Sequence, residues 1–374
     1  MKNVLILSNI PAPYRTALFS YMQSGESQYR YQVLYTSHTE ADRAWKVSEE
    51  ELKDTYFLSS KILRVKGGDV GGTATRYIHI PYGLTKMLNR LKPQVIIGGE
   101  YNLSAVRTLL WAKRHGVPYI NMTDGTLRSE AYIGRVQKLT RKLIIGKADA
   151  YLASGTRAKE KLLHWGAPEE KIAVALLTVD VPPFVKLTRQ PQENTILYVG
   201  RISREKGLDL LVEALAAMEH LNARLRVVGN DVDGQQAEIQ ALADRLGVSS
   251  RIDWLGYREG EALLSEYSGA TVLAVPSRSD CFGLILVEAG CAGLPVAASV
   301  YADGACDVVV PGKNGLMANP EKPEEFAAAL DALLENPDVS QELRTQLGEK
   351  FSFAAVAKGY DQAVRIAEGG RNHG

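Results

Sequence analysis

Two acidic side chains in a strand–loop–helix pattern have the clearest chemical content in this sequence. Asp280 and Glu288 stand in the segment 277–296, directly after an apolar run, 271–275, that predicts a buried strand. A helix is expected to begin near Phe282, and its free N–H groups favour a phosphate at the carboxyl end of that strand. One carboxylate precedes the helix and the other lies about two turns inside it, so both can reach hydroxyls. The pattern predicts a site for a nucleotide diphosphate between two sugars, the ribose and a donor sugar.

Two cations stand in a second loop of the same kind, 200–207, which has the sequence Gly-Arg-Ile-Ser-Arg-Glu-Lys-Gly. The loop follows a predicted apolar strand and precedes a helix. Arg201 offers a planar fork of donors and Lys206 a point charge, which together suit the two phosphates of a leaving diphosphate. The alternative is a solvated capping loop whose cations form ion pairs with Glu205 or Asp209.

The two segments together resemble the retaining glycosyltransferases of the GT-B fold, family 4, whose signature has two acidic residues separated by seven others. This chain has Asp280 where the family has Glu, and Cys281 where the family has Gly; the residues that match include Phe282, Gly283 and Glu288. The candidates for catalysis are Arg201, Lys206, Asp280, Glu288 and Asp124. The candidates for donor binding are Gly200, Tyr257, Arg258, Cys281, Phe282, Gly283, Leu284 and Arg15.

The resemblance implies an α/β chain of two Rossmann-like, doubly wound domains that face each other across a cleft. The expected parts are an acceptor-binding domain at 1–185, a nucleotide-sugar domain at 186–352 and a helix at 353–374 that crosses back to the first domain. The implied reaction transfers a sugar with retention: the acceptor hydroxyl attacks the face that the diphosphate leaves, and the departing phosphate oxygen takes the proton. No cofactor or metal is expected.

The implied donor substrate is a UDP- or GDP-sugar, with UDP favoured, and the acceptor is a glycan, a lipid-linked sugar or a small molecule. Bacterial polysaccharide or glycoconjugate synthesis is the expected setting. Two alternatives stay open. A non-hydrolysing sugar-nucleotide epimerase would have a similar two-domain form, and an inactive scaffold subunit would fit the departures at Asp280 and Cys281.

The first half of the chain adds three candidates at the ends of predicted strands. Arg15 closes an Asn-Ile-Pro-Ala-Pro-Tyr-Arg loop where many family members carry Gly-Gly. It is either a ligand for a donor or acceptor phosphate, or an ordinary first-turn arginine. Asp124 stands where the family often has a histidine, and it either accepts from a sugar hydroxyl or makes a turn before Gly125. Glu100 is a candidate for contact with acceptor hydroxyls.

Three other segments have competing interpretations. Asp231-Val232-Asp233 matches the Asp-x-Asp metal motif of other glycosyltransferases, but its place after a strand and before Gly234 favours a hydrogen-bonded turn. The histidines have no metal-ligand spacing. Tyr257 either borders the nucleotide base or merely covers the domain. The Gly-rich segment 67–72 predicts a connector, because no Lys-Ser/Thr follows it as in a phosphate loop.

Apolar strands alternate with helices of ten to fifteen residues, which predicts parallel sheets covered on both faces. The first series stops at a Pro-rich, apolar-poor stretch, 181–194, which is the best candidate for a linker. The expected strands are 4–8, 31–36, 94–98, 118–122, 149–154 and 172–176 before it, and 195–200, 224–229, 251–255, 271–276 and 296–299 after it.

Length and charge agree with two domains. The chain has 374 residues, more than one hydrophobic core usually supports. Its net charge of +1 hides a split, since residues 1–190 carry +12 and the remainder −11.

Three cysteines without a CxxC motif indicate a reducing cytoplasm. Neither a signal peptide nor an apolar run of 18 residues is seen, so a cytoplasmic protein is expected.

A basic helix is expected in the first half of the chain. Arg135, Lys138 and Lys142 share one helical stripe beside an apolar stripe of Val136, Leu139 and Leu143, and Arg128 and Arg141 are expected to add to the positive charge. The stripe is either a solvated face or a peripheral contact with anionic lipid on the inner face of the membrane. Nucleic acid is not an expected partner, because no aromatic residues interleave with the cations.

Overall fold

The chain divides into two compact units. The computed structural model describes residues 1–39, 52–66, 75–231 and 234–369. The first unit runs from Met1 to Asp180 and takes in the chain from Phe353 onward, while the second runs from Val181 to Ser352. The sequence placed the division after residue 185. The structure places it after residue 180, because the short helix α6 (Pro182–Val185) packs against helices of the second unit.

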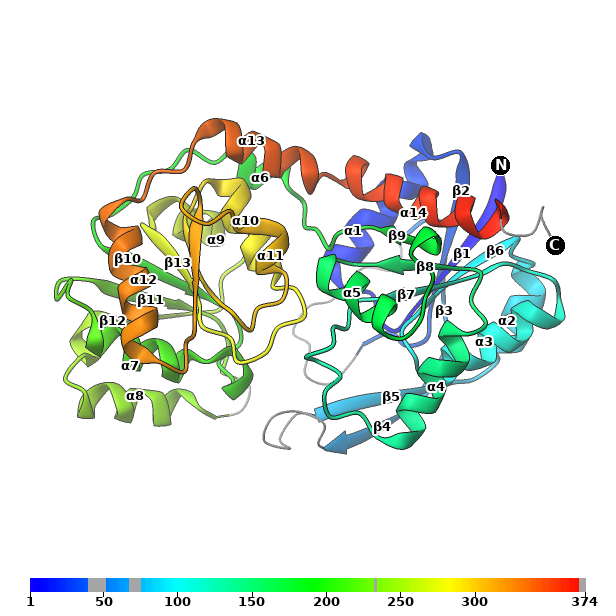
Figure 1. The fold of residues 1–374 in the computed structure, drawn as a ribbon, viewed down its shortest axis with the longest axis horizontal. Coiled ribbons are helices and arrows are strands. Elements are labelled where there is room, and N and C mark those ends of the chain that lie inside the picture. The colour runs from blue at the N-terminus through cyan, green and yellow to red at the C-terminus, as the bar shows by residue number, and fades with distance from the viewer. Residues whose placement is uncertain (40–51, 67–74, 232–233, 370–374) are drawn as a thin grey trace. The chain divides into compact units, whose positions relative to one another are not determined.

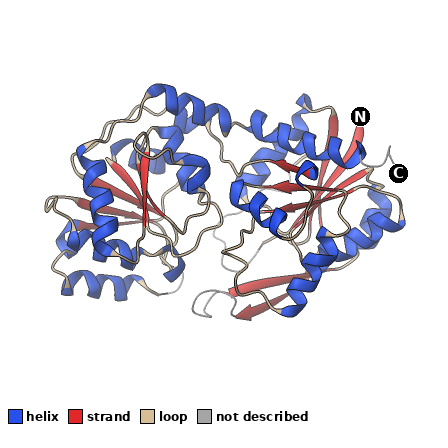
Figure 2. Ribbon diagram, viewed as in Figure 1, coloured by secondary structure: helices blue, strands red, loops and turns tan. Residues whose placement is uncertain are grey.

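The first unit is built on a seven-stranded parallel sheet with the strand order β3-β2-β1-β6-β7-β8-β9. Helices lie on both faces of it (Figures 1 and 2). The strands are β1 (Lys2–Ser8), β2 (Tyr29–Tyr35), β3 (Thr55–Phe57), β6 (Val95–Gly99), β7 (Tyr119–Thr123), β8 (Ala150–Ala153) and β9 (Ile172–Val174). The helices are α1 (Pro13–Tyr21), which continues as a π-helical turn (Met22–Glu26), α2 (Leu84–Leu91), α3 (Leu103–Arg114), α4 (Arg135–Ile145), α5 (Thr156–His164) and α14 (Phe353–Gly369).

The central strand β1 shows why this sheet is covered twice. Its side chains alternate between the faces, so Val4 and Ile6 join one buried cluster while Leu5 and Leu7 join another. The last helix, α14, contributes to the first of these clusters. Gly359 permits its close approach, because a Cβ there would lie 2.3 Å from the carbonyl oxygen of Val174. The C-terminal helix is thereby part of the core of the first unit.

The second unit repeats the plan with a six-stranded parallel sheet in the order β12-β11-β10-β13-β14-β15. Its strands are β10 (Thr195–Val199), β11 (Arg224–Val228), β12 (Ile252–Gly256), β13 (Val272–Val275), β14 (Val296–Ser299) and β15 (Gly315–Ala318). Besides α6, its helices are α7 (Leu208–Ala217), α8 (Gln236–Arg245), α9 (Gly260–Gly269), α10 (Leu284–Ala292), α11 (Ala305–Val308), α12 (Pro323–Glu335) and α13 (Gln341–Lys350). The prediction of an α/β fold with two parallel, doubly wound sheets is confirmed.

The sequence missed four strands. The antiparallel hairpin of β4 (Ser60–Lys66) and β5 (Thr75–Pro81) lies outside both sheets, and exposed Ile62, Leu63 and Ile78 interrupt its alternation. The strands β3 and β15 are only three and four residues long, too short for a periodic signal. The segment 67–72 lies outside the described residues. Within the described residues, none of the helices combines the length and apolar character needed to cross a membrane.

Candidate functional site

The carboxyl ends of the two central strands, β10 and β13, frame a cavity in the second unit. Strand β10 lies between β11 and β13, so the strand order reverses beside it. Doubly wound sheets bind ligands at this point. The cavity has a volume of about 90 Å³. Its lining comes from the ends of both strands, the loop after each and the start of α10: Tyr198, Val199, Gly200, Lys206, Ala274, Val275, Pro276, Ser277, Asp280, Gly283, Leu284 and Ile285.

Lys206 and Asp280 meet in this cavity, although they come from different loops. The Nζ of Lys206 lies 2.5 Å from Oδ2 of Asp280. The loops can approach because residue 207 is glycine: its φ is +69°, and a Cβ there would lie 2.2 Å from the carbonyl oxygen of Pro276. A second bridge joins the same loops, since the Arg278 guanidinium donates to the carboxylate of Asp209 at 2.6 and 2.7 Å.

Lys206 is a fixed cation that still has donors to spare. Its side chain is 23% exposed. Burial alone would lower the pKa of Lys206, but the adjacent Asp280 carboxylate more than offsets this effect and raises it. An ammonium has three N–H donors, and Asp280 accepts one of them. Since no other acceptor is seen among the described residues, the remainder are available for an anion in the cavity.

The start of α10 supplies backbone donors to the same cavity. The first N–H groups of a helix have no acceptor inside that helix, and Gly283 and Leu284 line the cavity. Phe282, by contrast, is 3% exposed and packs edge-to-face on Phe351, with the ring centroids 6.4 Å apart. Neither Phe282 nor Cys281 is among the lining residues. The side chain of Phe282 thus anchors the loop to the core.

Neither Glu288 nor Arg201 lines the cavity. Glu288 accepts a hydrogen bond of 2.5 Å from the buried Tyr267 hydroxyl, and burial raises the pKa of its carboxyl group. Arg201 is 38% exposed, with Nη2 at 3.9 Å from Oε2 of Glu205. Its backbone carbonyl is fixed by the hydroxyl of Tyr198, which lines the cavity, at 2.8 Å.

Two further candidates from the sequence directly follow the carboxyl end of β12. Tyr257 is 54% exposed and donates to Glu259 at 2.8 Å, so its ring is open to a stacking partner. Arg258 forms an ion pair with the buried Glu266, whose carboxylate is also held by Arg226 at 2.7 Å. These contacts give Arg258 a role in joining β11, β12 and α9.

The Asp-x-Asp segment is described only at its first residue. Asp231 accepts hydrogen bonds from the backbone N–H groups of Gln235 and Gln236 at 2.9 and 3.1 Å, which caps the start of α8. Residues 232 and 233 lie outside the described part. Within the described ranges, no group of three or more His, Cys, Asp or Glu side chains is placed to hold a metal ion.

A larger cavity, of about 280 Å³, lies at the equivalent edge of the first sheet. We call it the first-unit pocket. Strand β1 lies between β2 and β6, so here too the strand order reverses. The lining comes from the loops after β1, β6 and β7: Ser8, Asn9, Ile10, Ala12, Tyr14, Arg15, Gly99, Glu100, Met122 and Asp124. All three polar candidates of the first half therefore share one pocket.

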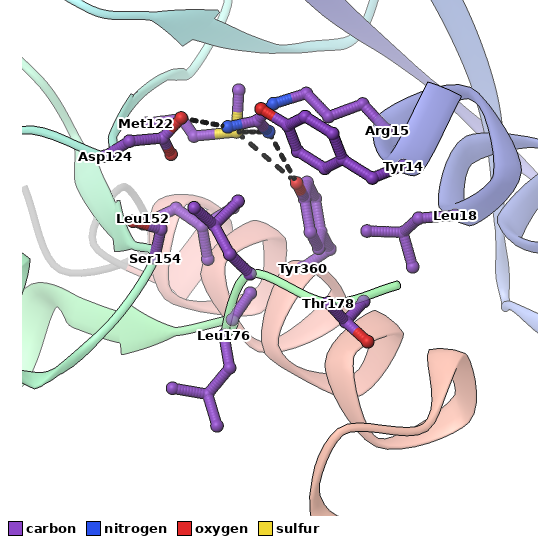
Figure 3. A pocket seen from close by; sticks show the side chains of 12 residues that line it. Tyr14, Arg15, Leu18, Met122, Asp124, Leu152, Ser154, Leu176, Thr178 and Tyr360 are labelled. Atoms are coloured by element: carbon purple, nitrogen blue, oxygen red, sulfur yellow. Dashed lines mark hydrogen bonds and ion pairs between the residues drawn. The ribbon is translucent and has the colours of Figure 1, made fainter. Parts of the chain in front are cut away.

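Arg15 and Asp124 form an ion pair at this pocket, with Nη2 at 2.5 Å from Oδ2. Figure 3 shows the pair from a neighbouring, smaller pocket that the same two residues also line. Arg15 Nη1 lies 3.5 Å from the hydroxyl of Tyr360 and from the sulfur of Met122. Burial alone would lower the pKa of Arg15, but Asp124 more than offsets it and the pKa is raised. From the sequence, Arg15 and Asp124 were predicted as separate candidates. In the structure they form an ion pair with each other.

Glu100 is held by a buried polar network that the sequence did not reveal. Its carboxylate accepts from the backbone N–H of Asp124 at 2.9 Å and from the hydroxyl of Thr123 at 3.2 Å. Lys161, whose side chain is fully buried, donates to the Thr123 hydroxyl at 2.6 Å and to Glu130 at 3.1 Å. A signal was present, because Lys161 stands among apolar residues on the inward face of α5.

The basic helix α4 differs from its prediction at one position. Arg135, Lys138 and Lys142 are exposed as expected, but Arg141 is 8% exposed and forms a two-bond ion pair with Glu130 at 2.7 and 2.9 Å. Arg141 therefore adds no charge to the surface. It belongs to the buried network around Lys161, because both cations bind Glu130.

Comparison with known proteins gives this arrangement a family. The sequence model of "Glycosyl transferases group 1" matches residues 184–351. A D-inositol 3-phosphate glycosyltransferase of Rhodococcus jostii is 27% identical over 311 residues, which are 75% of this chain and 68% of the relative. One from Corynebacterium kroppenstedtii is 30% identical over 257 residues, 61% of this chain and 56% of the relative.

Solved structures agree over nearly the whole chain. Anabaena Alr3699/HepE in complex with UDP superposes with a TM-score of 0.76 at 17% identity, covering 98% of this chain and 100% of that one. The lipopolysaccharide outer core galactosyltransferase WaaB gives 0.73 at 17% identity, covering 97% and 99%. Residues 184–351 match the glycosyl transferases group 1 family, and the chain is a glycosyltransferase with the GT-B fold.

Proposed function

We propose that this glycosyltransferase moves a sugar, with retention, from a nucleotide diphosphate donor bound in the second unit, and that UDP is the nucleotide. The observation that carries the proposal is the position of Lys206, a cation with spare donors beside the start of α10 at the carboxyl ends of β10 and β13. A cation and helix N–H groups at one point suit a diphosphate. The similar structures of Anabaena Alr3699/HepE in complex with UDP support the choice of nucleotide.

The proposed chemistry is mainly electrostatic. As the bond between the sugar and the diphosphate breaks, negative charge develops on the phosphate oxygens, and Lys206 and Arg201 stabilise it. The acceptor hydroxyl forms the new bond on the same face, and its proton passes to the departing phosphate oxygen. Asp280 orients Lys206 through their 2.5 Å contact. Glu288 binds the ribose of the donor. No cofactor or metal takes part in this scheme.

The nucleotide is tested by thermal denaturation of the full-length protein with UDP, GDP and ADP. A ligand at a hundred times its dissociation constant stabilises the folded state by about 2.7 kcal/mol. We expect UDP to raise the melting temperature of the wild type and not of Lys206→Ala, with Lys313→Ala, an exposed lysine of the same unit, as the control. Equal stabilisation of the Lys206→Ala variant would contradict the proposed diphosphate site.

Incubation with a UDP-sugar separates the alternative functions. A transferase leaves the donor intact until an acceptor is added, whereas an epimerase converts it to its epimer without one. A scaffold subunit would bind the donor and give no product with any acceptor of a broad panel. Retention is read directly from the anomeric configuration of the product by NMR.

We also propose that the enzyme reaches a lipid-linked acceptor by peripheral contact with an anionic membrane, in bacterial polysaccharide or glycoconjugate synthesis. Helix α4 carries Val136 and Leu139 with 75% and 68% of their surface exposed, beside the exposed cations Arg135, Lys138 and Lys142. Tyr132, just before the helix, is 60% exposed. Exposed apolar side chains among cations are typical of helices that lie in a lipid headgroup region.

Flotation with liposomes tests this contact. Each cation near an anionic surface contributes about 1 kcal/mol, and salt screens the attraction. The wild type should float with phosphatidylserine vesicles at low salt, and the triple variant R135E/K138E/K142E should not. The control R245E/K313E/K322E makes the same change of charge at exposed sites of the second unit. A wild type that stays unbound would point to a soluble acceptor.

A further inference from the structure

The first-unit pocket has the wrong charges and donors for an anion. Two of its side chains are carboxylates, Glu100 and Asp124, and its one cation is Arg15. Arg15 is only 9% exposed at the side chain, and its charge is paired with Asp124 at 2.5 Å. Lys206 is paired with Asp280 at the same distance but is 23% exposed at the side chain, so Arg15 is the less accessible of the two cations. The net charge of the three side chains is negative.

The backbone around the start of α1 also lacks donors. Pro11 and Pro13 have no N–H group. The N–H of Ala12 is bonded to the carbonyl of Ile10 at 3.0 Å, and that of Arg15 to the carbonyl of Ala12 at 2.9 Å. The start of a helix binds phosphate through free N–H groups. Most of the N–H groups at the start of α1 are either absent, at the prolines, or already hydrogen-bonded. The loop is thus unsuited to a phosphate despite its position.

The pocket does offer acceptors that are fixed in place. Glu100 has a backbone φ of +59°, a conformation that non-glycine residues rarely adopt, and it is held there by the hydrogen bonds from Asp124 and Thr123. Such strain persists where the surroundings enforce it, and it concentrates at functional sites. Lys161 donates to the Thr123 hydroxyl and so braces the same network from within.

Asp124 adds an acceptor with no partner. Its Oδ2 is used by Arg15, whereas its Oδ1 is buried and accepts no hydrogen bond from the described residues. A buried acceptor without a donor costs free energy, and a ligand hydroxyl in the pocket would supply that donor. Carboxylates accept from hydroxyl groups and repel phosphates, so the available chemistry selects for hydroxyls.

We propose that the first-unit pocket binds an uncharged, hydroxyl-rich ring, the non-phosphorylated sugar or polyol unit of the acceptor, and discriminates against phosphorylated ligands. The inference rests on the proposed function and narrows its acceptor. It separates this chain from the relatives named D-inositol 3-phosphate glycosyltransferase, whose name specifies a phosphorylated polyol. A lipid-linked glycan fits the inference when its terminal sugar, distant from the lipid phosphate, enters the pocket.

Ligand-observed NMR on the full-length protein with saturating UDP tests the proposal. The probes are matched pairs: myo-inositol with myo-inositol 1-phosphate, and the methyl glycosides of glucose, galactose, mannose and N-acetylglucosamine with their 6-phosphates. At least one neutral probe should give saturation transfer, and its phosphorylated partner should bind at least about tenfold more weakly. Stronger binding of the phosphorylated partners, or no signal from any neutral probe, would overturn the proposal.

Variants tie the signal to the pocket. Glu100→Gln should weaken the neutral probe at least about tenfold, the range expected when a hydrogen bond to a charged group is lost. Asp124→Asn provides a second variant if the first fails to fold, and the double variant should lessen the discrimination against phosphate. Glu160→Gln removes an exposed carboxylate of the same unit and should change nothing. Unchanged binding in both single variants would overturn the assignment.

The failure of this proposal is distinguishable from failure of the proposed function. Stabilisation by UDP is measured on the same preparations and depends on Lys206 in the second unit. If UDP binds and requires Lys206 while phosphorylated probes bind the first-unit pocket best, the donor site stands and the inference falls. If UDP does not bind, the proposed function itself falls.

Discussion

The two units place a cavity at the same point of the same kind of sheet, yet they prepare it for different ligands. In each, the central strand ends where the strand order reverses, and a cation meets a carboxylate with 2.5 Å between the paired atoms. In the second unit the loops contain glycines, and Lys206 keeps donors for a ligand. In the first unit the loop contains Pro11 and Pro13, and Arg15 is buried in its ion pair.

The comparison shows that the topology of a sheet determines where a ligand binds, but not which charge that ligand carries. The charge that a cavity accepts depends on how many backbone N–H groups remain free and whether the cation is already paired. Glycine at position 207 lets two loops converge, because any Cβ would collide with Pro276. Proline at 11 and 13 removes donors at the matching place in the first sheet. Four predictions test this contrast, from the largest expected effect to the smallest.

Removing either of the two cations proposed to bind the diphosphate, Lys206 or Arg201, should have the largest effect on the rate of transfer. Lys206→Ala and Arg201→Ala are each expected to slow transfer about 10²- to 10³-fold, or roughly 2.7–4 kcal/mol of barrier, as for loss of one donor to a developing negative charge. Lys206→Arg should restore part of the rate. Circular dichroism checks the fold, because Ala at 206 leaves Asp280 unpaired. Full activity of Lys206→Ala would remove the basis of the comparison.

Glu288→Gln should have a smaller effect, mainly on donor affinity. The carboxylate is expected to bind ribose hydroxyls, and loss of a hydrogen bond to a charged group weakens binding about tenfold. Isothermal titration with UDP measures it, and kcat should change less than the dissociation constant. Glu324→Gln, which changes an exposed carboxylate of the same unit, serves as the control. A change confined to kcat would argue for a role at the reacting centre.

Each unit contains a carboxyl group whose pKa is raised by burial, Glu288 in the second and Glu100 in the first. A group that binds its proton more tightly when folded stabilises the folded state most below its unfolded pKa, and this stabilisation is lost as pH rises through the folded pKa. Glu288→Gln and Glu100→Gln should therefore gain thermal stability relative to the wild type between pH 5 and pH 7. A constant difference across that range would refute the assignment.

Removal of metal ions is expected to have no effect on turnover. Because Lys206 and Arg201 are proposed to neutralise the diphosphate, a chelator should leave turnover unchanged. The assay titrates EDTA against the full-length enzyme with a UDP-sugar donor. Loss of activity that magnesium or manganese restores would show that the cations of the second unit do not suffice.

The sequence by itself determined the sheets and the residues at their carboxyl edges. Apolar runs separated by helices predict parallel strands, and parallel strands bring the loops that contain Lys206 and Asp280 to one edge regardless of side-chain detail. The same logic placed Arg15, Glu100 and Asp124 at one edge of the first sheet. Local periodicity is enough for this, since it depends only on which residues are apolar and how they are spaced.

Only the tertiary structure decided how those side chains pair. Arg15 and Asp124 are 109 residues apart, and nothing in their local patterns links them. Lys161 and Arg141 are both buried with Glu130, although only Lys161 stands among apolar residues on its helix. Periodicity identifies the face of a helix but not the charged partner that a distant segment brings to it, and burial without such a partner would be unfavourable.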